Sequence, residues 1–291
     1  MTLSKEEAVR FLRDVLHIPD SSKQEPSLSF LNEIVKSYQH VSPWQCISAF
    51  ALPRSQRHLP TWEEIKRNQF AKRGGMCYEN NMFMKELLYA FNFDVNYASV
   101  HVYNPNDHLT IMVHGLTGSS SRHWVDVGST FPLFHPIPFD FDTNTIEYDT
   151  GFLRQRFVKT NSIIEWHLWR HNLPYDGCKL TNDGWYKFAY IKADIPCDLN
   201  VFNSPMTDWY TVEEGNEFFQ KPRAITYEKN KLIAIKGQKL LLETSNKVID
   251  RKKLENFDEV VKAYETYFPQ LPTEIVQDAL HHTVFNIELS N

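Results

Sequence analysis

The residue in this sequence best suited to nucleophilic chemistry is a cysteine that directly follows a glycine turn. Cys77 stands in the string Arg73-Gly74-Gly75-Met76-Cys77-Tyr78-Glu79-Asn80-Asn81. Two adjacent glycines allow the backbone to double back tightly, and a helical apolar pattern begins at Cys77. The unpaired N–H groups at a helix start stabilise an anion, which favours the nucleophilic thiolate. The alternative is a small buried core cysteine beside an ordinary turn.

A cysteine nucleophile needs an imidazole to move its proton and a third group to orient that imidazole. His108 opens an expected strand after a Pro/Asn/Asp turn, and Asp126 ends an apolar run. A buried carboxylate needs a donor, which an imidazole N–H would supply. The residue pattern alone does not choose His108 over His101 or His114, and it also fits Asp126 as a solvated residue at the end of a strand.

Three motifs, in order along the chain, resemble the arylamine N-acetyltransferase family. The glycine-turn string resembles the family's RGGxCxExN signature, whereas His108-Leu109-Thr110-Ile111 and Val125-Asp126-Val127-Gly128 resemble its HLxL and VDxG segments. The resemblance implies a catalytic triad of Cys77, His108 and Asp126 on a cysteine-protease-like core. It also implies an enzyme that moves an acetyl or related acyl group from acyl-coenzyme A to an aromatic amine or hydrazine, through a thioester on Cys77 and by a ping-pong mechanism.

The chain departs from the family pattern in two segments that, in relatives, contact the acceptor. Where the family has a PFENL-like segment, this chain has Pro43-Trp44-Gln45-Cys46-Ile47, and Gly128 is followed by Ser129 rather than phenylalanine. The resemblance therefore implies that Trp44 and Ser129 bind substrate, with an altered acceptor pocket.

Composition excludes several classes of protein. The 291 residues are 42% hydrophobic and 23% charged, with a net charge of -5, so neither disorder nor a general affinity for nucleic acid or membranes is expected. Four scattered cysteines predict neither a disulfide framework nor a zinc site. We expect a cytoplasmic enzyme without a metal or a permanently bound cofactor, which takes acetyl-CoA or another acyl-CoA as co-substrate.

Hydrophobic patterns predict an α+β fold in three parts. Capping boxes and helical spacing predict a helical bundle over residues 1–92, which carries Cys77. Short runs rich in β-branched and aromatic residues predict an antiparallel β barrel over 93–204, which carries His108 and Asp126. Strand patterns at 223–227, 231–235 and 239–243, then helical patterns at 257–267 and 273–281, predict an α/β lid over 205–291.

A second cluster of aromatic and histidine side chains is predicted to be structural. We expect His167 and His171 to share a face with Trp166 and Trp169, as a packed aromatic patch rather than a zinc site, because a third ligand is not evident.

Two alternative functions remain open from the sequence. The first is an amide hydrolase or a transglutaminase-like enzyme with the same triad. The second is a non-catalytic relative that binds acyl-CoA or an aromatic ligand without turnover.

Overall fold

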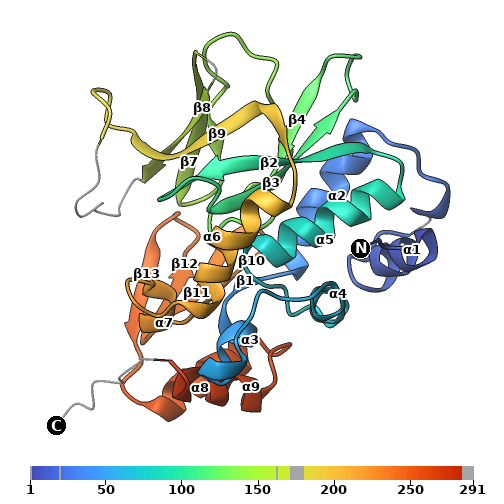
Figure 1. Ribbon diagram of the computed structural model, residues 1–291. Coiled ribbons are helices and arrows are strands. Elements are labelled where there is room, and N and C mark those ends of the chain that lie inside the picture. The colour runs from blue at the N-terminus through green and yellow to red at the C-terminus, as the bar shows by residue number, and fades with distance from the viewer. Residues whose placement is uncertain (1, 20, 162, 171–179, 284–291) are drawn as a thin grey trace.

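The computed structural model describes residues 2–19, 21–161, 163–170 and 180–283. Helices fill the N-terminal part, a large curled antiparallel sheet follows, and a smaller sheet with two helices ends the described chain (Figure 1). The expected α+β architecture is confirmed. The central sheet is a half-barrel rather than a closed barrel, because in the described residues strand pairing runs from β5 at one edge to β6 at the other.

Helix starts in the N-terminal part follow the capping signals in the sequence. Ser4 Oγ accepts from the Glu7 N–H at 3.1 Å, and Thr61 Oγ1 accepts from the Glu64 N–H at 3.4 Å. Such bonds satisfy N–H groups that the first turn leaves unpaired. The elements are α1 (Lys5–Asp14), η1 (Ser21–Lys23), α2 (Leu28–Val41), β1 (Trp44–Gln45), α3 (Ile47–Phe50), η2 (Arg54–Gln56), α4 (Trp62–Phe70) and α5 (Cys77–Ala90).

The central sheet has the order β5-β4-β3-β2-β9-β8-β7-β6. Its strands are β2 (Asp94–His101), β3 (His108–His114), β4 (Arg122–Val125), β5 (Ile137–Pro138), β6 (Tyr148–Asp149), β7 (Leu153–Thr160), β8 (Ile163–Arg170) and β9 (Tyr186–Cys197). Helix α5 packs on β2 and β3. This contact brings the helix that begins at Cys77 against the strand that begins at His108.

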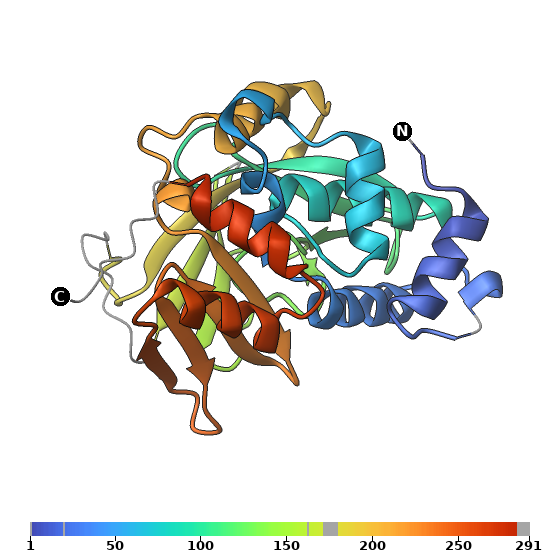
Figure 2. The same cartoon turned by 90° about the horizontal axis from the view of Figure 1, so that it is seen from below.

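The C-terminal sheet has the order β1-β10-β11-β12-β13, so a strand from the N-terminal part forms one edge. The remaining elements are α6 (Asn200–Thr211), α7 (Glu217–Gln220), β10 (Arg223–Glu228), β11 (Lys231–Lys236), β12 (Lys239–Glu243), β13 (Ile249–Lys253), α8 (Phe257–Tyr267) and α9 (Thr273–His281). Helix α8 packs on β11 and beside α9, which in turn packs on α3 (Figure 2).

Helix α6 runs across the expected boundary at residues 204–205 and contains Pro205, and the division of the chain into three parts stays a prediction. Among the described residues, the expected aromatic patch does not form on one face, because 163–170 is a strand whose alternate residues face opposite sides. Trp166 packs on Trp124 in the core, whereas His167 bonds to Glu165 at 2.7 Å. His171 lies outside the described residues.

Candidate active site

The glycine turn packs against one other segment of backbone, residues 43–45. Gly74 has φ +64°, and a Cβ atom there would lie 1.9 Å from the carbonyl oxygen of Pro43. In the same segment, the Gln45 N–H donates to the carbonyl of Gly75 at 3.1 Å. Trp44 and Gln45 also pair with β10. The turn therefore ties the start of α5 to the C-terminal sheet, which places Trp44 beside the thiol-bearing helix.

Cys77 is the first residue of α5 and is half-buried. Glu79 accepts the Met76 N–H at 2.9 Å and the Tyr210 hydroxyl at 2.9 Å. Burial raises the pKa of Glu79 to about 7, against the hydrogen bonds from Met76, Tyr210 and Asn68, which lower it. Part of the Glu79 population is therefore neutral near pH 7, which leaves less negative charge beside the N–H groups at the start of α5.

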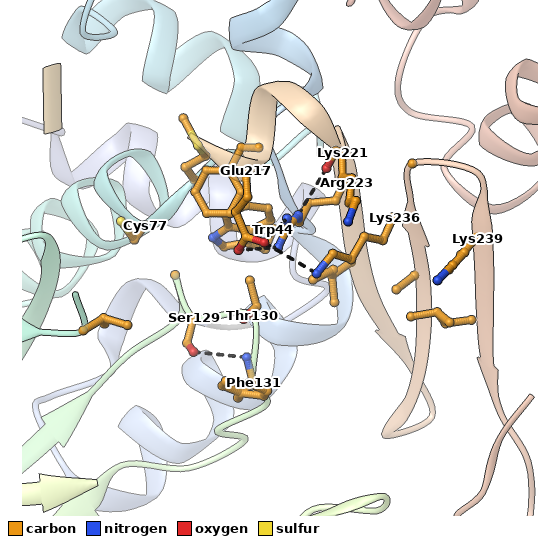
Figure 3. Close-up of a pocket in the computed structure, with 18 of the residues that line it drawn as sticks. Trp44, Cys77, Ser129, Thr130, Phe131, Glu217, Lys221, Arg223, Lys236 and Lys239 are labelled. Atoms are coloured by element: carbon orange, nitrogen blue, oxygen red, sulfur yellow. Dashed lines mark hydrogen bonds and ion pairs between the residues drawn. The ribbon is translucent and has the colours of Figure 1, made fainter. Parts of the chain in front are cut away.

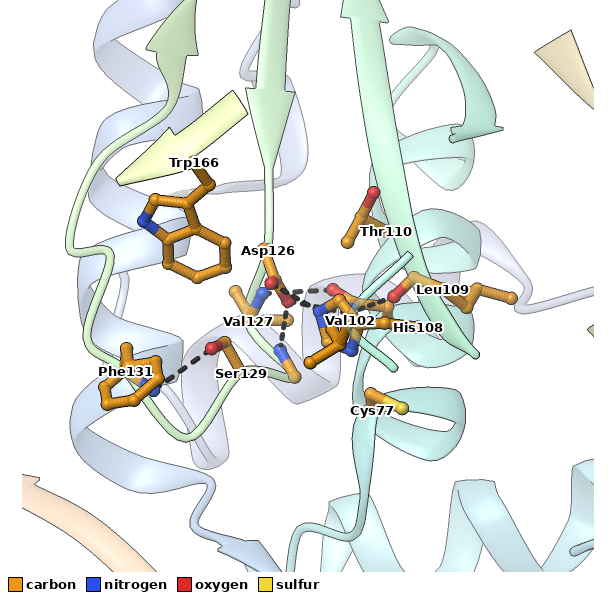
Figure 4. Close-up of polar contacts among 12 residues, drawn as sticks. Cys77, Val102, His108, Leu109, Thr110, Asp126, Val127, Ser129, Phe131 and Trp166 are labelled. Carbon is orange, nitrogen blue, oxygen red and sulfur yellow. Dashed lines mark hydrogen bonds and ion pairs between the residues drawn. The ribbon is translucent and has the colours of Figure 1, made fainter. Parts of the chain in front are cut away.

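His108 and Asp126 form a buried pair beside Cys77 (Figure 4). His108 Nε2 lies 2.6 Å from Asp126 Oδ2. Because the carboxylate engages Nε2, the other ring nitrogen, Nδ1, is the one left to interact with Cys77. The structure thus brings together the three residues expected to form a triad.

The charge of this pair changes the protonation of the imidazole. Burial alone would lower the pKa of His108, but the charges of Asp126 and Cys77, and their hydrogen bonds, outweigh burial and hold that pKa well above its ordinary value. The imidazolium is therefore the favoured form of His108 near neutral pH.

Asn81 holds the carboxylate of Asp126 in place. Its Nδ2 donates to Asp126 Oδ1 at 2.9 Å and to the carbonyl of Leu109 at 2.7 Å, and its Oδ1 accepts the Val127 N–H at 3.0 Å. Asn81 is one helical turn beyond Cys77 and points toward the same sheet. Sequence reasoning included Asn81 only as a letter of the signature and assigned it no role.

Asp107 orders the loop that precedes His108. Its carboxylate accepts the N–H groups of Val102, Tyr103 and Asn104, each at 2.8 Å. These bonds fix the approach of the chain to β3. Sequence reasoning missed this role, although Asp is a residue typical of such loops.

A cavity of about 800 Å³ opens over the thiol. Cys77, His108, Trp44 and Ser129 all line it, so both of the expected substrate-binding residues face the same space as the thiol (Figure 3). The Ser129 hydroxyl accepts the Phe131 N–H at 3.1 Å. Much of the cavity wall is aromatic and includes Phe131, Phe152, Phe188, Trp209, Tyr210 and Phe218.

Helix α6 supplies part of this wall, which sequence reasoning missed. Met206 Sδ lies 3.9 Å from Cys77 Sγ, and Met206, Trp209 and Tyr210 all line the cavity. A signal was present, because Phe202, Met206 and Tyr210 recur every four residues and are buried. Pro205 between them obscured it.

Within the described ranges, no helix is both long and apolar enough to cross a membrane. The residues described also contain no group of three or more His, Cys, Asp or Glu side chains that could hold a metal ion.

Comparisons with known proteins agree with this geometry. A family model described as N-acetyltransferase matches residues 67–273. A search of curated proteins finds no match. Among solved structures, the chain is similar to the Mycobacterium marinum arylamine N-acetyltransferase in complex with CoA, with 14% identity, a TM-score of 0.74, and coverage of 93% of this chain and 98% of that one.

Two further structures are similar over almost the whole chain. A variant of the Mycobacterium smegmatis arylamine N-acetyltransferase has 16% identity and a TM-score of 0.75, with 97% and 99% of the two chains covered. The Salmonella typhimurium enzyme has 12% identity and a TM-score of 0.73, with 97% and 100% covered. At such identities the structures show a shared fold, and the family model matches well over half of the chain. The chain belongs to the arylamine N-acetyltransferase family and is an N-acetyltransferase enzyme of that family.

Proposed function

We propose that this enzyme transfers an acetyl or related acyl group from acyl-CoA to a small aromatic amine or hydrazine, through a thioester on Cys77. The observation that carries the proposal is the chain of contacts from Asp126 through His108 to Cys77 at the wall of the cavity. A solved relative in complex with CoA supports the choice of donor.

In the first half-reaction, the Cys77 thiolate attacks the carbonyl carbon of the donor thioester. The bond between that carbon and the coenzyme sulfur breaks, and His108 returns the proton it holds to the departing coenzyme thiolate. Asp126 fixes the ring orientation and stabilises the imidazolium, the role a carboxylate has in other triads. Exchange between two thioesters is close to balanced in energy, so the protein's task is mainly alignment.

In the second half-reaction, the amine nitrogen attacks the acyl carbon on Cys77. His108 accepts the proton that the amine loses, and the carbon–sulfur bond to Cys77 breaks to restore the thiolate–imidazolium pair. An arylamine is a weak base that is unprotonated at neutral pH and can therefore attack. The aromatic wall formed by Trp44, Phe131 and Trp209 suits a flat aromatic acceptor.

The test is the intact mass of the protein after brief incubation with acetyl-CoA and no acceptor. We expect one added acetyl group on the wild type, none on Cys77→Ala, and full labelling of a Cys46→Ala control, since Cys46 is buried away from the cavity. Addition of an arylamine should discharge the adduct as the N-acetyl product.

The same experiment separates the alternatives. Release of acetate without transfer to an amine would favour a hydrolase. Binding of acetyl-CoA without an adduct, across a panel of acyl donors, would favour a non-catalytic binding protein and reject the proposal.

A further inference from the structure

The end of the cavity on the C-terminal sheet is lined by a row of lysines that crosses three strands. Lys236 on β11 lies directly opposite Lys239 on β12, and Lys239 lies directly opposite Lys253 on β13. Residues directly opposite each other share a face of the sheet, and like charges in such pairs are destabilising. All three lysines line the cavity. We define these three residues as the lysine row.

Arg251 adds a fourth cation on the same side. It lies two residues before Lys253 on β13, so the two side chains share a face, and it also lines the cavity. Lys253 contacts the exposed Glu255 at 3.1 Å, an ion pair that solvent largely screens. A cluster of four cations thus borders one cavity in a protein whose net charge is -5.

One carboxylate of the protein, that of Glu217, already contacts a member of this cluster, Lys236. Glu217 Oε2 lies 3.2 Å from Arg223 Nη2 and 3.8 Å from Lys236 Nζ. Burial would raise the pKa of Glu217, but the charges of Arg223, Lys236 and Lys221 outweigh it and lower that pKa. Glu217 is therefore an anion at neutral pH, and Figure 3 shows it between Trp44 and the lysines, away from Cys77.

We propose that the lysine row and Arg251 bind the phosphate groups of the acyl donor, and that Glu217 competes with those phosphates for Lys236 and Arg223. This inference rests on the proposed function, because it assumes a donor with a phosphorylated carrier. Phosphate oxygens accept charge-assisted bonds from ammonium and guanidinium groups. One cavity joins the row to the thiol, so a donor held by its phosphates can present its acyl end to Cys77.

The Glu217 carboxylate lowers the affinity of the site for the acyl donor. An arriving phosphate must displace the carboxylate from Lys236, or bind with the carboxylate close by, and either costs binding energy. Released coenzyme carries the same phosphates as the donor, so the competition also limits how tightly the product is held. Removal of the charge at residue 217 should therefore tighten coenzyme binding rather than weaken it.

The experiment measures the Kd for CoA by titration calorimetry at low and moderate salt. The variants are the double substitution Lys239→Gln with Lys253→Gln, the single substitution Glu217→Gln, and the control Lys252→Gln. Lys252 lies between two residues of the cluster but faces the other side of β13 and does not line the cavity. Each variant's Tm reports whether the fold is retained.

We expect the double variant to raise the Kd by about tenfold at low salt and to reduce its salt dependence. Glu217→Gln should lower the Kd by about threefold, whereas Lys252→Gln should match the wild type. If the double variant loses the same affinity for CoA and for dephospho-CoA, the lysine row binds the diphosphate. If it loses affinity for CoA alone, the lysine row binds the 3′-phosphate.

A wild-type Kd for the double variant, or an equal loss of CoA affinity in Lys252→Gln, would overturn the proposal that the lysine row binds the phosphates. An unchanged or higher Kd for Glu217→Gln would overturn the competition. Formation of the acetyl adduct on the wild-type protein tests the proposed function separately. A failure of the proposed function can therefore be told apart from a failure of the phosphate assignment.

Discussion

Asn81 Nδ2 lies 2.9 Å from Asp126 Oδ1, and this contact joins the helix that carries the thiol to the strand end that carries the carboxylate. Cys77 and Asn81 are both on α5, one turn apart. A single rigid helix therefore sets the positions of the thiol and, through Asn81, of the group that orients His108.

Asn81→Ala should slow acetylation of Cys77 by acetyl-CoA by about tenfold to a hundredfold, the effect of losing a buried hydrogen bond to a charged group. The lost side chain would leave Asp126 free to turn and the Val127 N–H without its acceptor. Quench-flow mass spectrometry gives the rate, and the Kd for CoA should change little. A wild-type rate would show that Asp126 needs no support from Asn81.

Gly128→Ala should disturb the site through close contact with the first turns of α5. A Cβ atom at residue 128 would lie 2.6 Å from Asn81 Nδ2, 2.6 Å from Cys77 Cα and 2.9 Å from the Cys77 carbonyl oxygen. Since backbone cannot rotate away as a side chain can, either α5 or the strand end must shift. We expect a loss of about 2 kcal/mol in the free energy of unfolding and a slower acetylation of Cys77.

Gly115→Ala is the matched control for this substitution. Its φ is +74°, but a Cβ atom there meets no heavy atom within 4 Å. Gly115→Ala should lower the free energy of unfolding by about 1 kcal/mol through backbone strain and leave the acetylation rate of Cys77 unchanged. If both variants acetylate at the wild-type rate, close approach at Gly128 does not position the thiol.

Two of the described free cysteines, Cys46 and Cys77, should differ sharply in their reactivity toward iodoacetamide. Burial raises the pKa of Cys46 to about 12, against the backbone hydrogen bond and charge of Arg223, which lower it. Cys77 instead lines the cavity beside a protonated imidazole. Iodoacetamide at pH 7 should modify the Cys77 peptide in the native protein and the Cys46 peptide only after denaturation, as measured by peptide mapping, and bound CoA should protect Cys77. Equal rates at both cysteines would contradict this assignment.

Much of the site could be predicted from the sequence because its parts are local. Glycines before Cys77, a strand starting at His108 and an apolar run ending at Asp126 are each short patterns, and the family resemblance chose among the histidines. The contacts between them could not be derived from those patterns. They depend on how α5 packs on β2 and β3, which no spacing along the chain encodes.

The elements that were missed have weak local signals. Strand β13 reads Ile-Asp-Arg-Lys-Lys and is largely exposed, so it lacks the apolar alternation that predicts a strand and is held by pairing with β12. Helix α6 tolerates Pro205 because Phe202, Met206 and Tyr210 are buried against the site. Both elements line the cavity, so these two parts of its wall were the least predictable.

The buried carboxyl of Glu79 should make the stability of the fold depend on pH. Its pKa is about 7 in the folded protein, above the ordinary value of 4.5. A raised pKa means that the folded state binds more protons than the unfolded state between these values, so the free energy of unfolding falls as pH rises through that window. The shift corresponds to about 3 kcal/mol.

Glu79→Gln should remove this dependence, because an amide cannot ionise while its oxygen can still accept from the Met76 N–H and the Tyr210 hydroxyl. Urea denaturation at pH 5 and pH 7.5 measures the difference. Glu7→Gln is the matched control, since Glu7 holds the same position at the start of α1 but is part-exposed with a lowered pKa, and its ion-pair partner is Lys66. Its stabilising charge is lost only as pH falls below the ordinary range, so this variant should keep the wild-type slope between pH 5 and 7.5. Equal slopes in the wild type and Glu79→Gln would mean that Glu79 is ionised throughout, with its charge opposing the thiolate at the start of α5.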